Sequence, residues 1–189
     1  MIKYPNNIKP KYKTKYKTKY KVYGNRGMTL ENELNETNRY YLENNIAVIY
    51  KKPTPIKVVK QLNEKIVSAY FEKPSTTDYN GLYKGKYLDF EAKETKKNTA
   101  FPLNNIHPHQ IEHIKNVINH QGICFLIVRF TKLNKTYLLF GKDFLEFISK
   151  ETRKSIPHEY FKTKGYLIKD KLAPKVDYLE IINKYGGIV

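Results

Sequence analysis

The chain has 189 residues and carries 35 Lys and Arg against 18 Asp and Glu, a net charge of +17 with a pI near 9.7. Such an excess favours a polyanionic partner, nucleic acid before a membrane surface, although charge alone does not specify the chemistry. A single cysteine excludes a thiolate zinc cluster within the chain, and no apolar run approaches the roughly 20 residues that span a bilayer. We therefore expect one domain of a cytoplasmic protein with no membrane partner, no secretory signal and a reduced, buried Cys124.

Residues 1–23 form a basic tail that contains eight lysines and no acidic residue. Its Lys-Tyr-Lys-Thr repeat cannot bury a core, so we expect disorder in the absence of DNA. Interleaved lysine and tyrosine suit phosphate contacts and stacking on unpaired bases, and a purely solubilising tail is the alternative. The globular domain is expected over residues 24–189, where Arg26 in the first turn is a candidate phosphate contact.

A helix is expected from Thr29, which suits the N-cap position, to about Leu42, because apolar residues recur there at helical spacing. Glu33 on this helix either faces a carboxylate site elsewhere in the fold or, as we favour, interacts with the helix dipole. The apolar run 46–50 then predicts a buried strand.

Residues 53–74 predict an extended two-stranded protrusion, because they alternate weakly and show no clear helix face. Pro53 and Pro55 at its root cannot donate to a sheet and interrupt the preceding strand. The protrusion would either reach into a branched DNA substrate or extend the sheet. Its lysines and those that flank it form a basic surface that we expect to contact DNA: Lys51, Lys52, Lys57 and Lys60.

The stretch 75–93 predicts a β-hairpin with a two-residue turn at Lys84-Gly85. This register sets Asp78 directly opposite Glu91 on the neighbouring strand. Because side chains alternate along a strand, one polar face would carry Asp78, Asn80, Asp89, Glu91 and Lys93.

The opposed carboxylates of Asp78 and Glu91 have no packing rationale in a sheet, since like charges there repel. A Mg²⁺ ion removes this conflict, because it prefers carboxylate oxygens and retains several waters. Lys93 would then steer an attacking water or meet the charge that develops on a phosphate. The alternative for these three residues is an ordinary solvated polar face.

The rest of the chain predicts alternating helices and strands. After a polar loop over 94–102, Pro108 opens a helix whose first turn holds Gln110, which could point back at the sheet and supply an oxygen. The remaining expected elements are strands 123–130 and 135–140, an amphipathic helix from Asp143, a basic irregular segment over 152–170 and a last helix over about 176–185.

The run from His109 to His113 matches the H-x-x-E-H motif of zinc peptidases, and its two histidines would share one helix face. A peptidase would need a further zinc ligand on a second helix. It would also leave the positive charge and the Asp/Glu/Lys hairpin unexplained. We therefore favour histidines that lie beside a nucleic-acid site over zinc ligands.

The spacing of Asp78, Glu91 and Lys93 is a form of the PD-(D/E)xK nuclease signature, with Thr77 in the place of the proline. Over roughly residues 24–185 the chain resembles the RecU-type Holliday junction resolvases, and the peptidase motif falls within a helix of that pattern. The blocks that carry this resemblance include Asn25-Arg26-Gly27-Met28, Leu34-Asn35-Glu36-Thr37-Asn38, Lys51-Lys52-Pro53-Thr54-Pro55, Ser75-Thr76-Thr77-Asp78-Tyr79-Asn80-Gly81, Asp89-Phe90-Glu91-Ala92-Lys93 and Phe101-Pro102-Leu103.

The resemblance implies an α/β, restriction-endonuclease-like mixed sheet flanked by helices, from which residues of about 53–74 protrude as a stalk into the junction centre. It implies a homodimeric, Mg²⁺-dependent endonuclease that cuts four-way DNA junctions symmetrically, alongside recombination proteins, in a bacterial cytoplasm. The alternatives are a non-catalytic DNA-architecture protein and a restriction-type nuclease on the same fold. The implied metal ligands and the implied transition-state stabiliser are Thr76, Asp78, Glu91 and Gln110, and Lys93, respectively.

Overall fold

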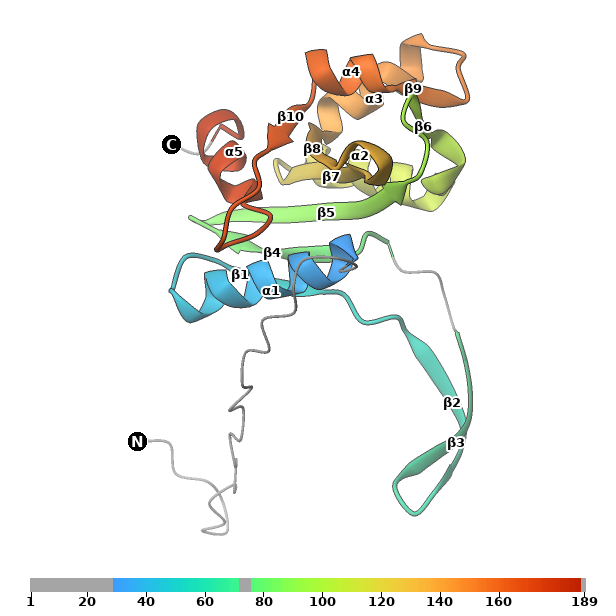
Figure 1. The fold of residues 1–189 in the computed structure, drawn as a ribbon. Helices are drawn as coiled ribbons and strands as arrows, with labels where there is room; N and C mark the ends of the chain where they lie inside the picture. Colours follow the sequence, from blue (N-terminus) through green and yellow to red (C-terminus); the bar gives the residue numbers. More distant parts are fainter. Residues whose placement is uncertain (1–28, 72–75, 188–189) are drawn as a thin grey trace.

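The structure is a computed structural model that describes residues 29–71 and 76–187, and Figure 1 shows a mixed α/β body from which a narrow arm projects. The tail expected over 1–23 and the phosphate contact expected at Arg26 lie outside the described residues. Within the described part of the chain, no helix is long and apolar enough to cross a membrane.

The body is built around a six-stranded sheet in the order β1-β4-β5-β7-β8-β10. Neighbouring strands are antiparallel except β5 and β7, which run parallel, so the expected mixed sheet is present. The hairpin strands β4 and β5 are interior strands of this sheet. The strands of the body are β1 (Val48–Lys51), β4 (Tyr79–Tyr83), β5 (Lys86–Thr95), β6 (Ala100–Pro102), β7 (Ile123–Phe130), β8 (Lys135–Phe140), β9 (Ser155–Pro157) and β10 (Tyr166–Ile168).

Helices cover both faces of the sheet. Helices α1 and α5 pack on the face that carries Phe90 and Phe125, while α2, α3 and α4 pack on the face that carries Leu126 and Val128. Each face therefore has its own apolar cluster, as expected for a sheet that is buried on both sides. The helices are α1 (Leu30–Glu43), α2 (Pro108–Asn119), α3 (Gly141–Lys150), α4 (His158–Thr163) and α5 (Tyr178–Tyr185), with 3₁₀ turns at Leu103–Asn105 and Thr131–Leu133.

Helix α1 begins where the sequence predicts. The hydroxyl oxygen of Thr29 accepts a hydrogen bond from the backbone N–H of Asn32 at 3.4 Å, which satisfies one of the free donors at the helix start. The buried residues of α1 recur at helical spacing: Leu30, Leu34, Thr37, Asn38 and Tyr41. This apolar stripe explains why α1 packs against the sheet.

The hairpin has the predicted register. Lys84 and Gly85 both have positive φ, 46° and 73°, and Tyr83 pairs with Lys86 across the turn. Two consecutive residues with positive φ are typical of the tight turns whose twist matches that of paired strands, and glycine adopts this conformation without strain.

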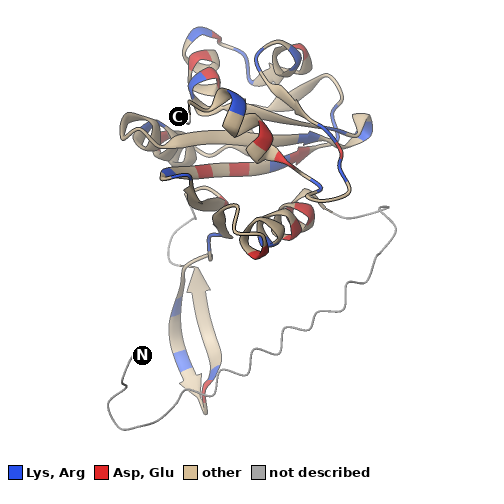
Figure 2. Ribbon diagram, turned by 90° about the vertical axis from the view of Figure 1, so that its left-hand side faces the viewer, with Lys and Arg blue, Asp and Glu red and all other residues tan. Residues whose placement is uncertain are grey.

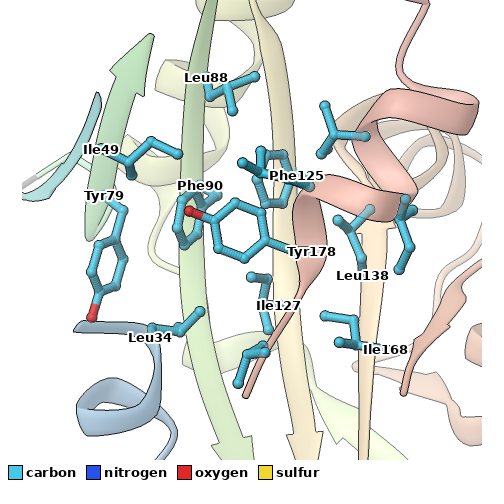
Figure 3. Packing of buried hydrophobic residues seen from close by; sticks show 14 of the residues in the cluster. Leu34, Ile49, Tyr79, Leu88, Phe90, Phe125, Ile127, Leu138, Ile168 and Tyr178 are labelled. Atoms are coloured by element: carbon cyan, nitrogen blue, oxygen red, sulfur yellow. The ribbon is translucent and has the colours of Figure 1, made fainter. Parts of the chain in front are cut away.

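A row of stacked rings holds β4, β5 and β7 together behind this hairpin. Tyr79 stacks on Phe90 with ring centroids 4.8 Å apart, and Phe90 stacks on Phe125 at 4.7 Å. Tyr178 of α5 packs over Phe90 and Phe125, as Figure 3 shows. Such pairs stabilise a core beyond the area that they bury. Because side chains alternate along a strand, the next residues in sequence point to the opposite face, where the polar side chains lie.

The arm is a separate antiparallel ribbon of β2 (Ile56–Leu62) and β3 (Lys65–Phe71), which projects from the body (Figure 1). Every residue of both strands is exposed, including the apolar ones. Lys57 and Lys60 lie on β2, and Figure 2 shows basic segments along the arm. Because an isolated two-stranded ribbon is only marginally stable in water, a binding partner would stabilise the arm.

The prediction of an irregular segment over 152–170 is wrong, because β9, α4 and β10 lie within it. The polar loop expected over 94–102 is also wrong in part, since it includes the end of β5 and all of β6, which pairs with β9. These short elements have no periodicity of their own. They form because side chains such as Ile156 and Phe161 are fully buried in the cluster beneath α2 and α3.

Candidate active site

Two carboxylates meet where β4 begins beside β5. The backbone N–H of Asp78 donates to Glu91 Oε2 at 3.1 Å, and the backbone N–H of Ala92 donates to Asp78 Oδ2 at 3.1 Å. Each carboxylate thus accepts a hydrogen bond from the backbone that carries the other. These reciprocal bonds hold the two side chains together on one face of the sheet, as the hairpin register predicts.

Lys93 lies against both carboxylates. Its Nζ is within hydrogen-bonding distance of Glu91 Oε1 and is 3.9 Å from Asp78 Oδ2. The Glu91 side chain is fully buried, whereas those of Asp78 and Lys93 are 31% and 27% exposed. The site is therefore closed behind Glu91 and open to solvent at Asp78 and Lys93.

Helix α2 covers the buried side of the site through Gln110. Its Nε2 donates to Glu91 Oε1 at 2.7 Å, while its Oε1 accepts from the backbone N–H of His107 at 2.9 Å. The side chain points back at the sheet, as the sequence predicts, but it presents its N–H group to the site and uses its oxygen to cap α2. In this arrangement Gln110 orients Glu91, and its role as a metal ligand stays a prediction.

Burial and the neighbouring carboxylate of Asp78 raise the pKa of Glu91 to about 7, against the opposing effect of Lys93. A carboxyl pKa raised in this way indicates that the site holds too little positive charge to keep both carboxylates ionised. A divalent cation would supply that charge.

The donors at the site suit such a cation, because carboxylate, hydroxyl and amide oxygens are the ligands that Mg²⁺ prefers. Among the residues that the structure describes, no group of three His, Cys, Asp or Glu side chains could hold a metal ion. Any ligands beyond Asp78 and Glu91 would therefore be hydroxyl, amide or water oxygens. The residues present fit a cation that retains several waters.

Comparison with known sequences identifies the family. Residues 25–184 match the family model described as Recombination protein U, RecU. A protein from Pediococcus pentosaceus named Holliday junction resolvase RecU is 49% identical over 192 residues, which covers 96% of this chain and 96% of its own length. The chain belongs to the RecU family.

Two further RecU relatives have the same printed name. One from Streptococcus thermophilus is 48% identical over 99% of this chain and 98% of its own length, and one from Bacillus cytotoxicus is 52% identical over 85% and 84%. A solved structure of Archaeoglobus fulgidus Hjc, titled a Holliday junction resolvase, covers 66% of this chain and 85% of its own at 9% identity. Its TM-score of 0.36 is too low to support a conclusion about this RecU chain.

The consecutive lysines at the end of β1 point in opposite directions in the RecU chain, as strand alternation requires. Lys51 Nζ pairs with Glu31 Oε1 of α1 at 2.5 Å on the surface. Lys52 Nζ instead turns inward to Asp89 Oδ2 at 2.7 Å, and only 15% of its side chain is exposed. Thr76, the remaining expected metal ligand, accepts from Lys52 Nζ at 3.0 Å. The sequence analysis had treated both lysines alike, although alternation was the available signal that separates them.

Glu33 of α1 is held by a strand rather than by the carboxylate site. Its Oε2 lies 2.5 Å from Arg129 Nη2 of β7, and both side chains are mostly buried. No local pattern could have predicted this ion pair, because the two residues are 96 positions apart.

The two histidines of the H-x-x-E-H motif have different neighbours in the RecU helix α2. His113 Nε2 lies 3.1 Å from Asp89 Oδ2. The ring of His109 stacks on that of His107, with centroids 5.6 Å apart. His113 thus belongs to a polar cluster around Asp89, next to the carboxylate site.

The raised pKa of Glu91 predicts a pH-dependent stability difference between the wild-type RecU chain and Glu91→Gln. The folded-state pKa of about 7 exceeds the ordinary value of 4.5, so ionisation of Glu91 costs stability progressively as pH rises through this window. In EDTA, Glu91→Gln should therefore gain about 1–3 kcal/mol of unfolding free energy relative to wild type between pH 4.5 and pH 8. Urea unfolding across this range measures the gain. A difference that is constant with pH would contradict the assigned charge balance.

Proposed function

We propose that this RecU chain is a Mg²⁺-dependent endonuclease that resolves four-way (Holliday) DNA junctions by symmetric phosphodiester hydrolysis during recombination and repair. The observation that carries the proposal is the grouping of Asp78, Glu91 and Lys93 on adjoining strands, with a lysine against two carboxylates. The name of its relatives, Holliday junction resolvase, supports the junction as the substrate. Because chromosomal DNA is the source of such junctions, we place the protein in the cytoplasm, together with other recombination proteins.

The residues of the site have separate roles in this reaction. Asp78 and Glu91 would hold the cation, with Thr76 and Gln110 as further oxygen ligands. When bound, Mg²⁺ supplies Lewis-acid stabilisation of the scissile phosphodiester and activation of the attacking water. Lys93, at the open edge of the site, would offset the negative charge that develops on the phosphate in the transition state.

Buried Glu91 is the residue whose orientation the protein controls most closely. It accepts hydrogen bonds from the backbone N–H of Asp78 and from Gln110 Nε2, in addition to its contact with Lys93. A carboxylate held by three donors has little rotational freedom. The ligand geometry would therefore be largely preorganised before the cation binds.

Symmetric incision requires two identical sites, because a four-way junction has two-fold symmetry. We therefore propose a homodimer, whose two active sites would act on opposing strands. The arm would enter the junction centre, where its basic and aromatic side chains suit converging phosphates and unstacked bases. Tyr70 and Phe71 at the end of β3 are 52% and 75% exposed. The proposed phosphate contacts of the arm, its root and the N-terminal region are Lys57, Lys60, Lys51, Lys52 and Arg26.

Two alternative functions differ from this proposal in their products. A DNA-architecture protein would bind junctions without cutting, but carboxylates that face phosphates would then only weaken binding. A restriction-type nuclease would cut linear duplex as readily as a junction.

The deciding experiment compares a labelled four-way junction with a linear duplex of the same sequence, in Mg²⁺ and in EDTA. We expect paired cuts in opposing strands of the junction in Mg²⁺, no cuts in EDTA and little cutting of the duplex. Equal cutting of both substrates would favour the restriction-type nuclease. Tight junction binding without cutting in Mg²⁺ or Mn²⁺ would favour the architecture protein.

A further inference from the structure

A second polar cluster, centred on Asp89, lies beside the carboxylate site and has no part in the proposed chemistry. Asp89 is fully buried on β5, two residues before the metal-site carboxylate of the same strand. Its Oδ1 accepts a hydrogen bond from the hydroxyl of Thr77. Its Oδ2 accepts from Lys52 Nζ at 2.7 Å and from the hydroxyl of Tyr87 at 2.8 Å, and His113 Nε2 lies 3.1 Å away. The carboxylate therefore has donors on both oxygens.

Lys52 links this cluster to the segment that carries Asp78. Its Nζ donates to Thr76 Oγ1 at 3.0 Å and to Thr77 Oγ1 at 2.7 Å, as well as to Asp89 Oδ2. These three acceptors match the three donors of an ammonium group. The backbone N–H of Lys52 also donates to the carbonyl oxygen of Asp78 at 2.8 Å. One residue thus holds three consecutive residues in front of β4.

The same contacts close the root of the arm. The chain leaves the body after Lys52 and returns at Thr76, with β2 and β3 between these two points. Any force on the arm during junction binding would act on this root. A clasp between the two ends of the insertion would keep the residues that follow Thr76 in place against β5.

Stability alone does not explain the cluster. Desolvation of a buried lysine–aspartate pair costs about as much as the attraction returns, and apolar residues of similar volume often stabilise a protein as well or better. What the cluster does provide is a fixed geometry, because Lys52 and Asp89 are each held by several partners.

We propose that Lys52, anchored by Asp89 and Thr77, is a positioning residue that sets Thr76 and Asp78 for cation binding, and is not a direct contact to DNA phosphate. This inference rests on the proposed metal-dependent nuclease activity. Hydrogen bonds that orient metal ligands from outside the coordination shell typically change metal affinity by about 10–100-fold.

The test measures Mn²⁺ binding to the full-length, DNA-free protein by electron paramagnetic resonance, together with junction affinity and single-turnover cleavage in Mg²⁺. Lys52→Met removes the ammonium, and Thr77→Val removes the bridging hydroxyl with little change of shape. Both should weaken Mn²⁺ binding by about 10–100-fold and slow cleavage, while the junction Kd stays near that of wild type. Lys162→Met, which breaks a surface pair with Glu159 on α4, is the charge-matched control and should keep normal Mn²⁺ affinity.

The double variant Lys52→Met/Asp89→Asn separates positioning from stability, because it removes both buried charges. It should regain unfolding free energy relative to Lys52→Met and still bind Mn²⁺ weakly. Wild-type Mn²⁺ affinity in the folded double variant would overturn the inference. So would a Lys52→Met protein that binds Mn²⁺ normally but binds junctions weakly with a shallower salt dependence, since this is the behaviour of a phosphate contact. Failure of the wild-type protein to bind Mn²⁺ would instead overturn the proposed metal site itself, and the inference with it.

Discussion

Asp78→Asn and Glu91→Gln should each abolish junction cleavage and leave junction binding intact or slightly tighter. Cation binding is worth several kcal/mol in the transition state, and each 1.36 kcal/mol is a factor of ten, so the rate should fall by about 10³-fold or more. Binding should survive because each change removes a negative charge that faces phosphate. Single-turnover cleavage in Mg²⁺ and junction titration in Ca²⁺ measure the two effects separately.

Lys93→Met is the matched comparison for these two variants. Its ammonium lies against both carboxylates, so its removal should leave cation binding intact or tighter while cleavage falls by about 10²–10³-fold. Loss of cation binding in Lys93→Met would assign a structural role to the lysine. Near-normal cleavage by either carboxylate variant would show that the metal assignment is wrong.

Replacement of Ile56–Phe71 by a short Gly-Asn turn should leave a folded body that binds duplex but no longer prefers four-way junctions. The arm contributes no residue to either apolar cluster of the body, so its removal costs the core little. Junction selectivity should fall because the converging strands of a crossover lose the surface that we propose enters between them. Competition of junction against duplex for binding, and the fraction of coordinated double incisions, measure the loss.

A charge variant with an intact arm distinguishes the shape of the arm from its charge. Lys57→Gln/Lys60→Gln keeps both strands and removes two exposed cations. If both lysines contact phosphates on duplex arms, the slope of log K against log salt should become shallower by about 0.9 per contact. Junction preference should largely remain, because the ribbon still fills the crossover. Normal junction selectivity in the protein without an arm would place shape recognition in the body.

The placement of the two carboxylates was accessible from the sequence. The Lys84-Gly85 turn sets the hairpin register, and strand alternation then places Asp78 beside Glu91 with Lys93 on the same face. Both rules depend only on the backbone within a few residues. The positions of α1, β7 and β8 were predictable for the same reason, since each carries enough residues to show its own periodicity.

The environment of those carboxylates depended on the tertiary structure. The polar face of β5 is not solvated in the folded chain: α2 covers it, buries Glu91 and raises its pKa to about 7. Gln110 could be predicted to reach back to the sheet, but the hydrogen bond from His107 decides that its N–H, and not its oxygen, meets Glu91. Desolvation and amide orientation both depend on neighbours that are distant in sequence.

Lys51 and Lys52 show most directly where sequence and structure divide. Composition and motif place two adjacent lysines at the root of a predicted protrusion and predict DNA contact for both. Alternation requires them to point apart, but only the fold supplies Glu31 to one and buried Asp89, 37 residues further along the chain, to the other. Local backbone rules thus determined the site's spacing and register in this protein. Contacts between distant segments decided which of its charges face DNA and which hold the site together.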